Sequence, residues 1–290
     1  MTGLKERLVE QALALPLGDR SALMRVASLC GDPEIPPAEI ALQAARDEAF
    51  SALLLKIANS TWSGSRRPIA DLTHAIVRLG TSLVQGIAFA APGLRLLESP
   101  SDGLGPARRE LHRHAVRVGI VARSLAADNV TSEQALAAGL VHNLGLNVLS
   151  VIAPETFREL VAAGGRGQRL AEAEEALLGF THADLGAAVA EEWSYPPALT
   201  CAIRDHDHDD PVAPVTVAVR LADLLTRERG IGVEPPDSGE LADADPAGAA
   251  AARAEPLLDA LDRMESAPGD PPKAPSVSDA TLRTARAALG

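Results

Sequence analysis

The sequence predicts an all-α protein. Hydrophobic residues make up 47% of the 290 residues but aromatic residues only 2%, so the core must consist of Leu, Val, Ile and Ala. Such side chains favour helices that pack closely against one another. No segment shows a convincing alternation of apolar and polar residues. The β-branched run at 215–219 is the best exception, and the leucines that follow it favour a helix there as well.

Helix start and stop signals divide the first third of the chain into short helices. Pro37 suits the first turn of a helix, and Asp71 is placed to cap another that breaks at Gly80. In order, the predicted helices run from Leu4 to a stop at Pro16, over 19–29, from Pro37 through 40–45, over 50–59, from Asp71 to Leu79, and from 81 or 82 to near Pro92.

Residues 99–106 are rich in Ser, Gly and Pro and form the predicted connector to a second helical part. The helices predicted in that part are 108–127, 135–150 behind an N-cap at Thr131, a short one opened by Pro154, 169–178, 182–193, 197–205 and 212–227. We therefore expect one domain over residues 1–230, with an N-terminal helical layer at 1–98 and a second half at 106–228.

The last part of the chain differs in composition. Residues 234–248 and 266–278 are rich in Pro and small or acidic residues, which bury too little apolar surface to offset the entropy of ordering. Short helices at 256–264 and 280–289 are compatible with the sequence. We expect residues 231–290 to form an acidic, largely flexible tail.

Charge and cysteine usage limit the functional class. The formal net charge of −12 argues against general nucleic-acid binding, which needs a basic surface. Cys30 and Cys201 form no metal-binding or disulfide pattern, as expected in a reducing compartment. No window reaches the roughly 18 apolar residues that a membrane span needs. These features predict a soluble cytoplasmic protein without membrane contact.

The run 139–145 places His142 and Asn143 inside an otherwise apolar segment. Burying a polar pair without a partner is costly, so this pair should be hydrogen-bonded or bound to a ligand. Further candidate ligands are His114, His182, His206, His208 and Asp223. Imidazole with carboxylate suits zinc, manganese or iron. On spacing alone, however, scattered histidines are more often satisfied helix residues than ligands.

Three stretches resemble a known family. They are 53–60 with 67–69 and 75–80; 111–115 leading to 138–145; and 182–186 followed by Trp193, Pro196 and 202–206. With them, residues 15–227 resemble the HDOD family, the output domain related to HD-type metal phosphohydrolases. The resemblance implies an all-helical fold in which a front helical layer joins an HD-like helical half.

The resemblance also implies a set of site residues. His114 matches the first metal ligand of the HD pattern, His142 the His of the HD pair, and Asp223 the closing Asp; His182 and His206 match additional histidines of two-metal relatives. Asn143 stands where the Asp of the pair belongs, and Asp207 replaces the second member of a His–His pair. A neutral amide binds a hard dication less strongly than a carboxylate does, and it cannot act as a general base. The candidate metal ligands are therefore His114, His142, Asn143, His182, His206 and Asp223, for Mn, Fe or Zn, and no catalytic residue is assigned.

The leading functional expectation is a non-catalytic bacterial signalling or regulatory module that contacts a signalling protein, with a ligand in the relic HD pocket. One alternative is a metal-dependent phosphohydrolase acting on a nucleotide or cyclic dinucleotide. Another is a metal-binding sensor without turnover. Arg109, Arg113 and Arg117 recur at four-residue spacing and form either a basic stripe for a phosphate or an acidic partner, or a solvated helix face.

Overall fold

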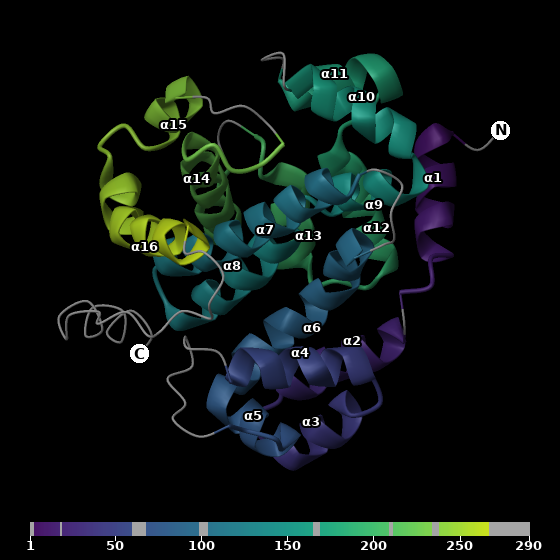
Figure 1. Cartoon of the computed structure of the whole chain (residues 1–290), viewed down its shortest axis with the longest axis vertical. Helices are drawn as coiled ribbons and strands as arrows, with labels where there is room; N and C mark the ends of the chain where they lie inside the picture. Colours follow the sequence, from purple (N-terminus) through teal and green to yellow (C-terminus); the bar gives the residue numbers. More distant parts are fainter. Residues whose placement is uncertain are drawn as a thin grey trace.

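The computed structural model describes residues 3–17, 19–59, 68–98, 104–164, 169–208, 211–233 and 238–266. The regular elements in these ranges are all helices, which confirms the all-α prediction (Figure 1). The loop predicted at 60–68 falls almost wholly outside the described residues, as do most of the connector predicted at 99–106 and the predicted helix at 280–289. The end of that connector, Gly105 and Pro106, is already helical.

One group of helices forms the lower part of the molecule in Figure 1. Its members are α2 (Arg20–Cys30), α3 (Pro37–Ala44), α4 (Glu48–Ala58), α5 (Leu72–Leu79) and α6 (Thr81–Arg95). They enclose a core that includes Leu23, Ile40 and Phe50, each fully buried. Asp47 and Asp71 accept hydrogen bonds from the first turns of α4 and α5, as N-caps do.

α6 connects this group to the rest of the fold. It continues past Pro92 to Arg95, although the sequence predicted an end near that proline. Proline removes one backbone hydrogen bond. Pro92 lies less than one turn from the helix end and is buried in the fold, so packing retains the last turn. A short 3₁₀ turn, Leu96–Glu98, follows.

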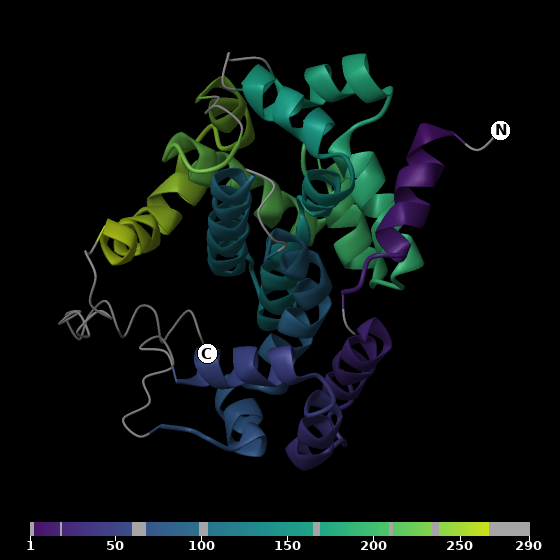
Figure 2. The ribbon, with the colours of Figure 1, turned by 45° about the vertical axis from the view of Figure 1, so that its right-hand side comes forward.

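The second group surrounds the larger core. It comprises α7 (Gly105–Leu125), α8 (Asn129–Val141), α9 (Leu144–Ile152), α10 (Pro154–Gly164), α11 (Leu170–Leu178), α12 (His182–Glu192), α13 (Pro197–Asp205) and α14 (Pro214–Glu228). α1 (Leu4–Leu13) joins this group rather than the N-terminal layer, because Leu8 and Ala12 are buried in the larger core. Figure 2 shows α1 beside α12 and α9, far along the chain from it. The expected N-terminal layer at 1–98 therefore does not include its first helix.

The predicted helix 135–150 is two helices. α8 ends at Val141 and α9 begins at Leu144, with Asn143 at φ −90° and ψ 28° between them. The N-cap of α8 is Asp128, which accepts from the Thr131 amide, rather than Thr131 itself. The apolar sequence gives no sign of the break. It places His142 at the end of one helix and Asn143 at the start of the next.

Part of the expected flexible tail is folded. α15 (Ser238–Ala244) and α16 (Ala249–Ser266) follow α14, and α16 packs against α7 and α14. Ala254 and Leu258 of α16 are buried in the larger core. The expectation of a flexible segment beginning at residue 231 is therefore wrong for 238–266, and residues 267–290 lie outside the described part of the chain.

Among the described residues, one helical stretch is long and apolar enough to cross a membrane, Thr131–Ile152, but 83% of its apolar window is buried inside the fold. The pair α5 and α6 passes the same test only when joined across a 105° bend. Such burial is typical of core helices.

Tyr195 joins the two groups of helices. Its hydroxyl donates a hydrogen bond to the carbonyl of Phe89 on α6, and the two rings meet edge to face with centroids 5.8 Å apart. Burial raises the pKa of Tyr195, so its proton remains available for the bond. Replacing Tyr195 with Phe retains the ring contact but removes the hydroxyl that donates to the Phe89 carbonyl across the junction. We expect the free energy of unfolding in urea to fall by about 1–2 kcal/mol; an unchanged midpoint would show that this bond does not stabilise the junction.

Candidate metal centre

Three side chains from distant parts of the chain meet at the middle of the second group. His114 lies on α7, His142 ends α8 and Asp223 lies on α14. Oδ1 of Asp223 is 2.8 Å from Nε2 of His114 and 3.5 Å from Nε2 of His142, and the two Nε2 atoms are 3.2 Å apart. The exposed fractions of these residues are 3%, 0% and 4% in the order of the chain. They form a closed group of three potential ligands.

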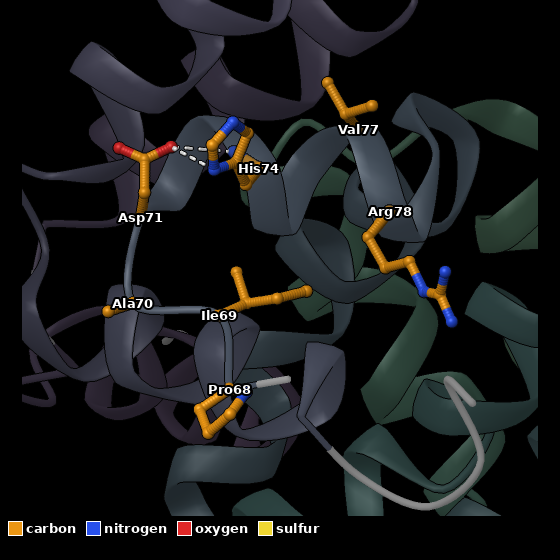
Figure 3. A pocket seen from close by; sticks show the side chains of 7 residues that line it. All are labelled: Pro68, Ile69, Ala70, Asp71, His74, Val77 and Arg78. Carbon is orange, nitrogen blue, oxygen red and sulfur yellow. Dashed lines mark hydrogen bonds and ion pairs between the residues drawn. The ribbon is translucent and has the colours of Figure 1, made fainter. Parts of the chain in front are cut away.

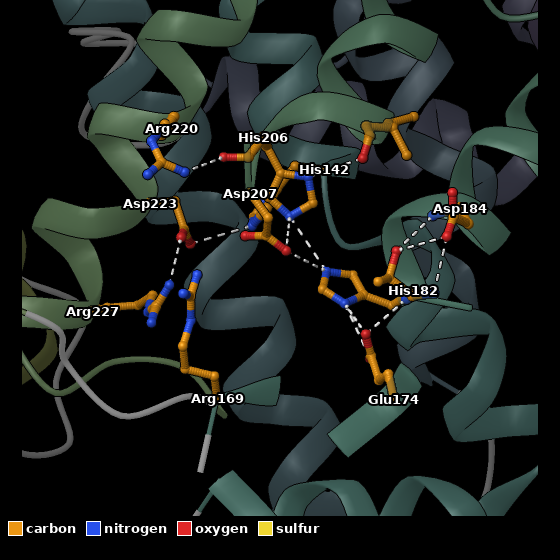
Figure 4. A network of polar contacts seen from close by, with 12 residues as sticks. His142, Arg169, Glu174, His182, Asp184, His206, Asp207, Arg220, Asp223 and Arg227 are labelled. Carbon is orange, nitrogen blue, oxygen red and sulfur yellow. Dashed lines mark hydrogen bonds and ion pairs between the residues drawn. The ribbon is translucent and has the colours of Figure 1, made fainter. Parts of the chain in front are cut away.

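A second group of the same kind adjoins the first. It consists of His182 at the start of α12, His206 at the end of α13, and Asp207 (Figure 4). The two Nε2 atoms are 3.3 Å apart, and Oδ2 of Asp207 lies 3.6 Å and 3.5 Å from them. The rings of His142 and His206 meet edge to face at 5.0 Å, so the two groups are in direct contact.

The other ring nitrogen of each histidine is held by an acceptor. Carbonyl oxygens only accept hydrogen bonds, so an Nδ1 atom that faces one must donate, and Nδ1 of His182 faces a carboxylate in the same way. In a neutral imidazole with Nδ1 protonated, Nε2 keeps its lone pair. The acceptors are the Ile231 carbonyl at 2.9 Å from His114, the Gly139 carbonyl at 2.7 Å from His142, the Glu174 carboxylate at 2.8 Å from His182 and the Ile203 carbonyl at 2.9 Å from His206. Four imidazole lone pairs therefore point at the two carboxylates and at one another.

This donor set fits a metal ion. Nitrogen and oxygen ligands about 2.0–2.2 Å from one ion lie roughly 2.9–3.5 Å apart at ordinary coordination angles. The distances within the two groups run from 2.8 to 3.6 Å. Two imidazole lone pairs at such separations repel each other unless a proton or a cation lies between them. Both groups thus have the spacing and the protonation pattern of metal ligands.

The electrostatics favour ionised carboxylates at Asp223 and Asp207 and a neutral imidazole at His206. Burial opposes ionisation of Asp223, but its contacts with His114 and His142 and the charge of Arg227 outweigh it and hold its pKa well below the usual range. The pKa of Asp207 is also lowered, because the nearby histidines outweigh its burial. Burial lowers the pKa of His206 to about 4, against the opposing effect of Asp207, so this ring is neutral near pH 7.

His182 is positioned by two local features. Thr181 and Asp184 form a capping box, which fixes the first turn of α12. Glu174 of α11, fully buried, accepts from both the amide and the Nδ1 of His182. A carboxylate behind a ligating imidazole orients the ring and makes its Nε2 more basic.

Close backbone contacts set the spacing of the helices that carry these residues. A Cβ atom added at Gly139 would lie 2.7 Å from the Cα atom of Gly119, which brings α8 against α7. A Cβ atom at Gly145 would lie 2.0 Å from the carbonyl oxygen of His182, and one at Gly186 would lie 2.8 Å from the amide nitrogen of Gly145. α9 and α12 thus touch through their backbones beside the metal centre.

The structure brings together five of the six candidate ligands from the sequence: His114, His142, His182, His206 and Asp223. Asn143, the sixth, is half-buried at the start of α9 and makes no side-chain cap there. Sequence reasoning did not assign a ligand role to Asp207 or notice Glu174. Asp207 stands in a polar run that reads as an exposed helix end, and Glu174 stands among other glutamates of α11.

The three arginines of the predicted stripe have different surroundings. Arg109 is exposed, whereas Arg113 and Arg117 are paired with carboxylates of α16. The acidic helix α16 therefore covers Arg117 and pairs with Arg113, whose side chain is still 41% exposed, so a freely solvated face is wrong for Arg117.

A surface hollow on α5 lies apart from this centre (Figure 3). It is lined by Pro68, Ile69, Ala70, Asp71, His74, Val77 and Arg78. The imidazole of His74 is 80% exposed and pairs at 3.7 Å with Asp71, the cap of the same helix. Its side chains do not converge as those of the metal centre do.

Comparisons with known proteins agree with the fold. A protein of Treponema pallidum (strain Nichols), described as uncharacterized, is 30% identical over 200 residues; the match covers 67% of this chain and 38% of that protein. A crystal structure of an HDOD domain protein of unknown function from Geobacter sulfurreducens has a TM-score of 0.70 at 22% identity and covers 84% of this chain and 90% of that one. A candidate phosphohydrolase from Shewanella amazonensis SB2B has a TM-score of 0.65 at 22% identity, with coverage of 89% and 93%.

The family model described as HDOD domain matches residues 19–209, a range that contains four of the five clustered candidate ligands and ends just before α14, which supplies Asp223. The motifs at 111–115, 139–145 and 182–186 each contribute a histidine to the centre. The chain belongs to the HDOD domain family.

Proposed function

We propose that this chain is a regulatory signalling module that holds a divalent metal ion in its histidine–carboxylate centre and acts by contact with another protein. The observation that carries the proposal is the set of four imidazoles whose Nδ1 atoms are all bonded outward and whose Nε2 atoms converge with two carboxylates. Bound there, a divalent ion would supply positive charge and Lewis acidity to a site that otherwise holds only lone pairs and carboxylates.

The enclosure of the centre supports binding rather than turnover. Five of its six side chains are at most 6% exposed, and only the side chain of Asp207, at 24%, is open to solvent. A phosphoester substrate needs room beside the metal and a group that accepts a proton. Asn143 provides no such group, because a carboxamide is not a base. The ion is therefore proposed to fix the arrangement of α7, α8 and α14, whose outer surfaces a partner would recognise.

Location and partner are also part of the proposal. We place the protein in the cytoplasm, since both cysteines are free thiols. The partner is proposed to be a signalling protein, since the net charge of −12 disfavours nucleic acid.

A metal-dependent phosphohydrolase acting on a nucleotide or cyclic dinucleotide is the second candidate. The observation in its favour is the presence of two adjacent His–His–Asp groups, because paired ions can bind both the attacking and the leaving oxygen of a phosphoester. For this activity, another group of the centre would have to accept the proton that the carboxamide of Asn143 cannot accept.

The experiment loads untagged protein with Mn, Fe(II) or Zn, removes excess metal by gel filtration, and measures metal content and hydrolysis of bis(p-nitrophenyl) phosphate and a cyclic dinucleotide. We expect at least one equivalent of retained metal and no turnover above a metal-only blank. Turnover that is lost in His142→Ala would instead establish the phosphohydrolase. Protein that retains none of the three metals would overturn the metal-binding proposal.

Asn143→Asp serves as the matched variant for this experiment. It is nearly isosteric and adds one negative charge beside His142. A carboxylate binds a hard dication better than an amide does, so the dissociation constant should fall by about tenfold or more. If the metal affinity does not change, the side chain of residue 143 does not face the ion. The asparagine at this position, where the HD pattern has aspartate, is then not the reason for absent turnover.

A further inference from the structure

α16 packs against α7 and α14 of the second group of helices (Figure 2). Several of its carboxylates face arginines there. Arg117 of α7 pairs with Asp262 at 2.6 Å and with Glu265 at 2.9 Å, and Arg113 pairs with Glu265 at 2.5 Å. Arg229, after α14, binds Asp262 at 2.6 Å. The side chain of Arg117 is only 1% exposed under this cover.

The apolar part of this interface is small. Ala254 and Leu258 are the residues of α16 that are buried in the larger core, while Leu257 and Leu261 are only partly covered. The carboxylates of Asp262 and Glu265 are 37% and 35% exposed, and ion pairs that reach solvent contribute little to stability and weaken with salt. A helix held in this way can separate from the domain while the core beneath it stays folded.

A continuous set of hydrogen bonds runs from α16 to the metal centre. Glu265 binds Arg113, whose guanidinium also donates to Glu110 at 3.0 Å. The other oxygen of Glu110 accepts from the amide of Gly232 at 3.0 Å. The carbonyl of the preceding residue, Ile231, accepts from Nδ1 of His114 at 2.9 Å.

The segment at Ile231 and Gly232 lies directly on the His114 ring. Gly232 has φ +131°, and a Cβ atom there would be 3.0 Å from Nδ1 of His114. Ile231 is 2% exposed. The orientation of the His114 ring therefore depends on the segment 231–232. Glu110 holds this segment through the amide of Gly232, and Arg113, which pairs with Glu265 of α16, holds Glu110.

We propose that docking of α16 and metal binding at His114 are coupled: α16 is a detachable strap that holds the segment 231–232 against His114. This inference rests on the proposed function, since it requires that the centre binds metal. By linkage, metal binding must strengthen docking of α16 by the same factor as docking of α16 strengthens metal binding. An event that removes α16 would loosen the metal, and loss of metal would release α16.

Two variants of α16 separate this relay from a general effect of charge. Glu265→Gln weakens the contacts to Arg113 and Arg117. Glu255→Gln removes the same formal charge from the same helix, but Glu255 pairs with Arg229, which is not one of the residues that link Glu265 to His114. Glu110→Ala breaks the relay itself and leaves the ion pairs of Arg117 with α16 in place.

The experiment uses the full chain, with and without the metal that it retains best. Hydrogen exchange of amides in 249–266 reports docking of α16, and competition with a chelator gives the metal dissociation constant. We expect metal to slow exchange in α16, and Glu265→Gln and Glu110→Ala to weaken metal binding about tenfold, the usual size for a group behind a ligand. Glu255→Gln should stay within about twofold.

The outcomes distinguish this inference from the proposal on which it rests. If the wild-type chain retains no metal, the proposed function and the coupling both fail. If metal is retained but exchange in α16 does not respond to it, and Glu265→Gln binds metal as the wild type does, only the coupling is overturned. Equal weakening by Glu265→Gln and Glu255→Gln would also overturn it, because charge alone would then account for the effect.

Discussion

Replacing Gly145 with alanine should destabilise the protein by about 3 kcal/mol or more, the upper part of the range for overpacking. A Cβ atom at this position would lie 2.0 Å from the carbonyl oxygen of His182 and 3.0 Å from the amide nitrogen of Gly186. Both neighbours are backbone atoms of α12, so no side chain can turn aside. Relief requires that α9 and α12 separate, which opens the core and displaces His182.

The gain from a better helix former does not offset this cost, since alanine exceeds glycine by only about 1 kcal/mol in a helix. Chemical denaturation monitored by circular dichroism measures the change. Gly105→Ala is the control, because the nearest atom to its added Cβ is the flexible end of Arg109 at 3.4 Å. A Gly145→Ala protein as stable as this control would mean that α9 and α12 are not in backbone contact in solution.

Asp223→Asn is expected to reduce metal affinity by more than about 100-fold, beyond the range for a residue behind a ligand. Asp223 is the only acidic residue among the three ligands His114, His142 and Asp223. One oxygen of its carboxylate contacts both imidazoles. Asparagine keeps the shape but removes the charge. In the wild type, excess metal should raise the melting temperature, as any ligand of the native state does; in Asp223→Asn the melting temperature should not respond.

Elemental analysis after gel filtration measures the metal that each variant retains. Thermal unfolding with and without metal measures the response of the melting temperature. Glu191→Gln is the matched control: it also removes one carboxylate charge, but from an exposed pair with Arg204. Retention of a full equivalent of metal by Asp223→Asn would show that the ion lies in the His182 group alone. If excess metal raises the melting temperature of Asp223→Asn as much as that of Glu191→Gln, the ion likewise lies in the His182 group alone.

Local sequence signals predicted most helices because caps, prolines and glycines act over a few residues. Asp47 and Asp71 cap the helices that follow them, and Pro37 and Pro197 each stand at a helix start. The break between α8 and α9 was missed because it lies in an apolar run without proline. At the break, Nδ1 of His142 donates to the Gly139 carbonyl, a contact that the apolar sequence does not predict.

Features that depend on distant partners could not be predicted from the sequence. α16 is rich in alanine and acid and resembles a solvated tail until Arg117 and Arg229 are placed opposite its carboxylates. Glu174 gives no signal of its own, because its role depends on the approach of His182. Five ligand candidates were predicted through the family motifs rather than from spacing, because the residues that meet lie far apart in the chain: His182 and His206 are 24 positions apart, and His114 and Asp223 are 109 positions apart.

The division between α8 and α9 also bears on how such a centre changes over generations. His142 ends one helix and residue 143 begins the next, so the side chain at 143 can be exchanged without rotating the imidazole beside it. Codons for aspartate and asparagine differ by a single base. A lineage can therefore pass between an acidic and a neutral centre in one mutational step and keep the scaffold unchanged. Exchange between asparagine and aspartate at 143 is readily reversible, so related chains can differ in chemistry while they share every helix.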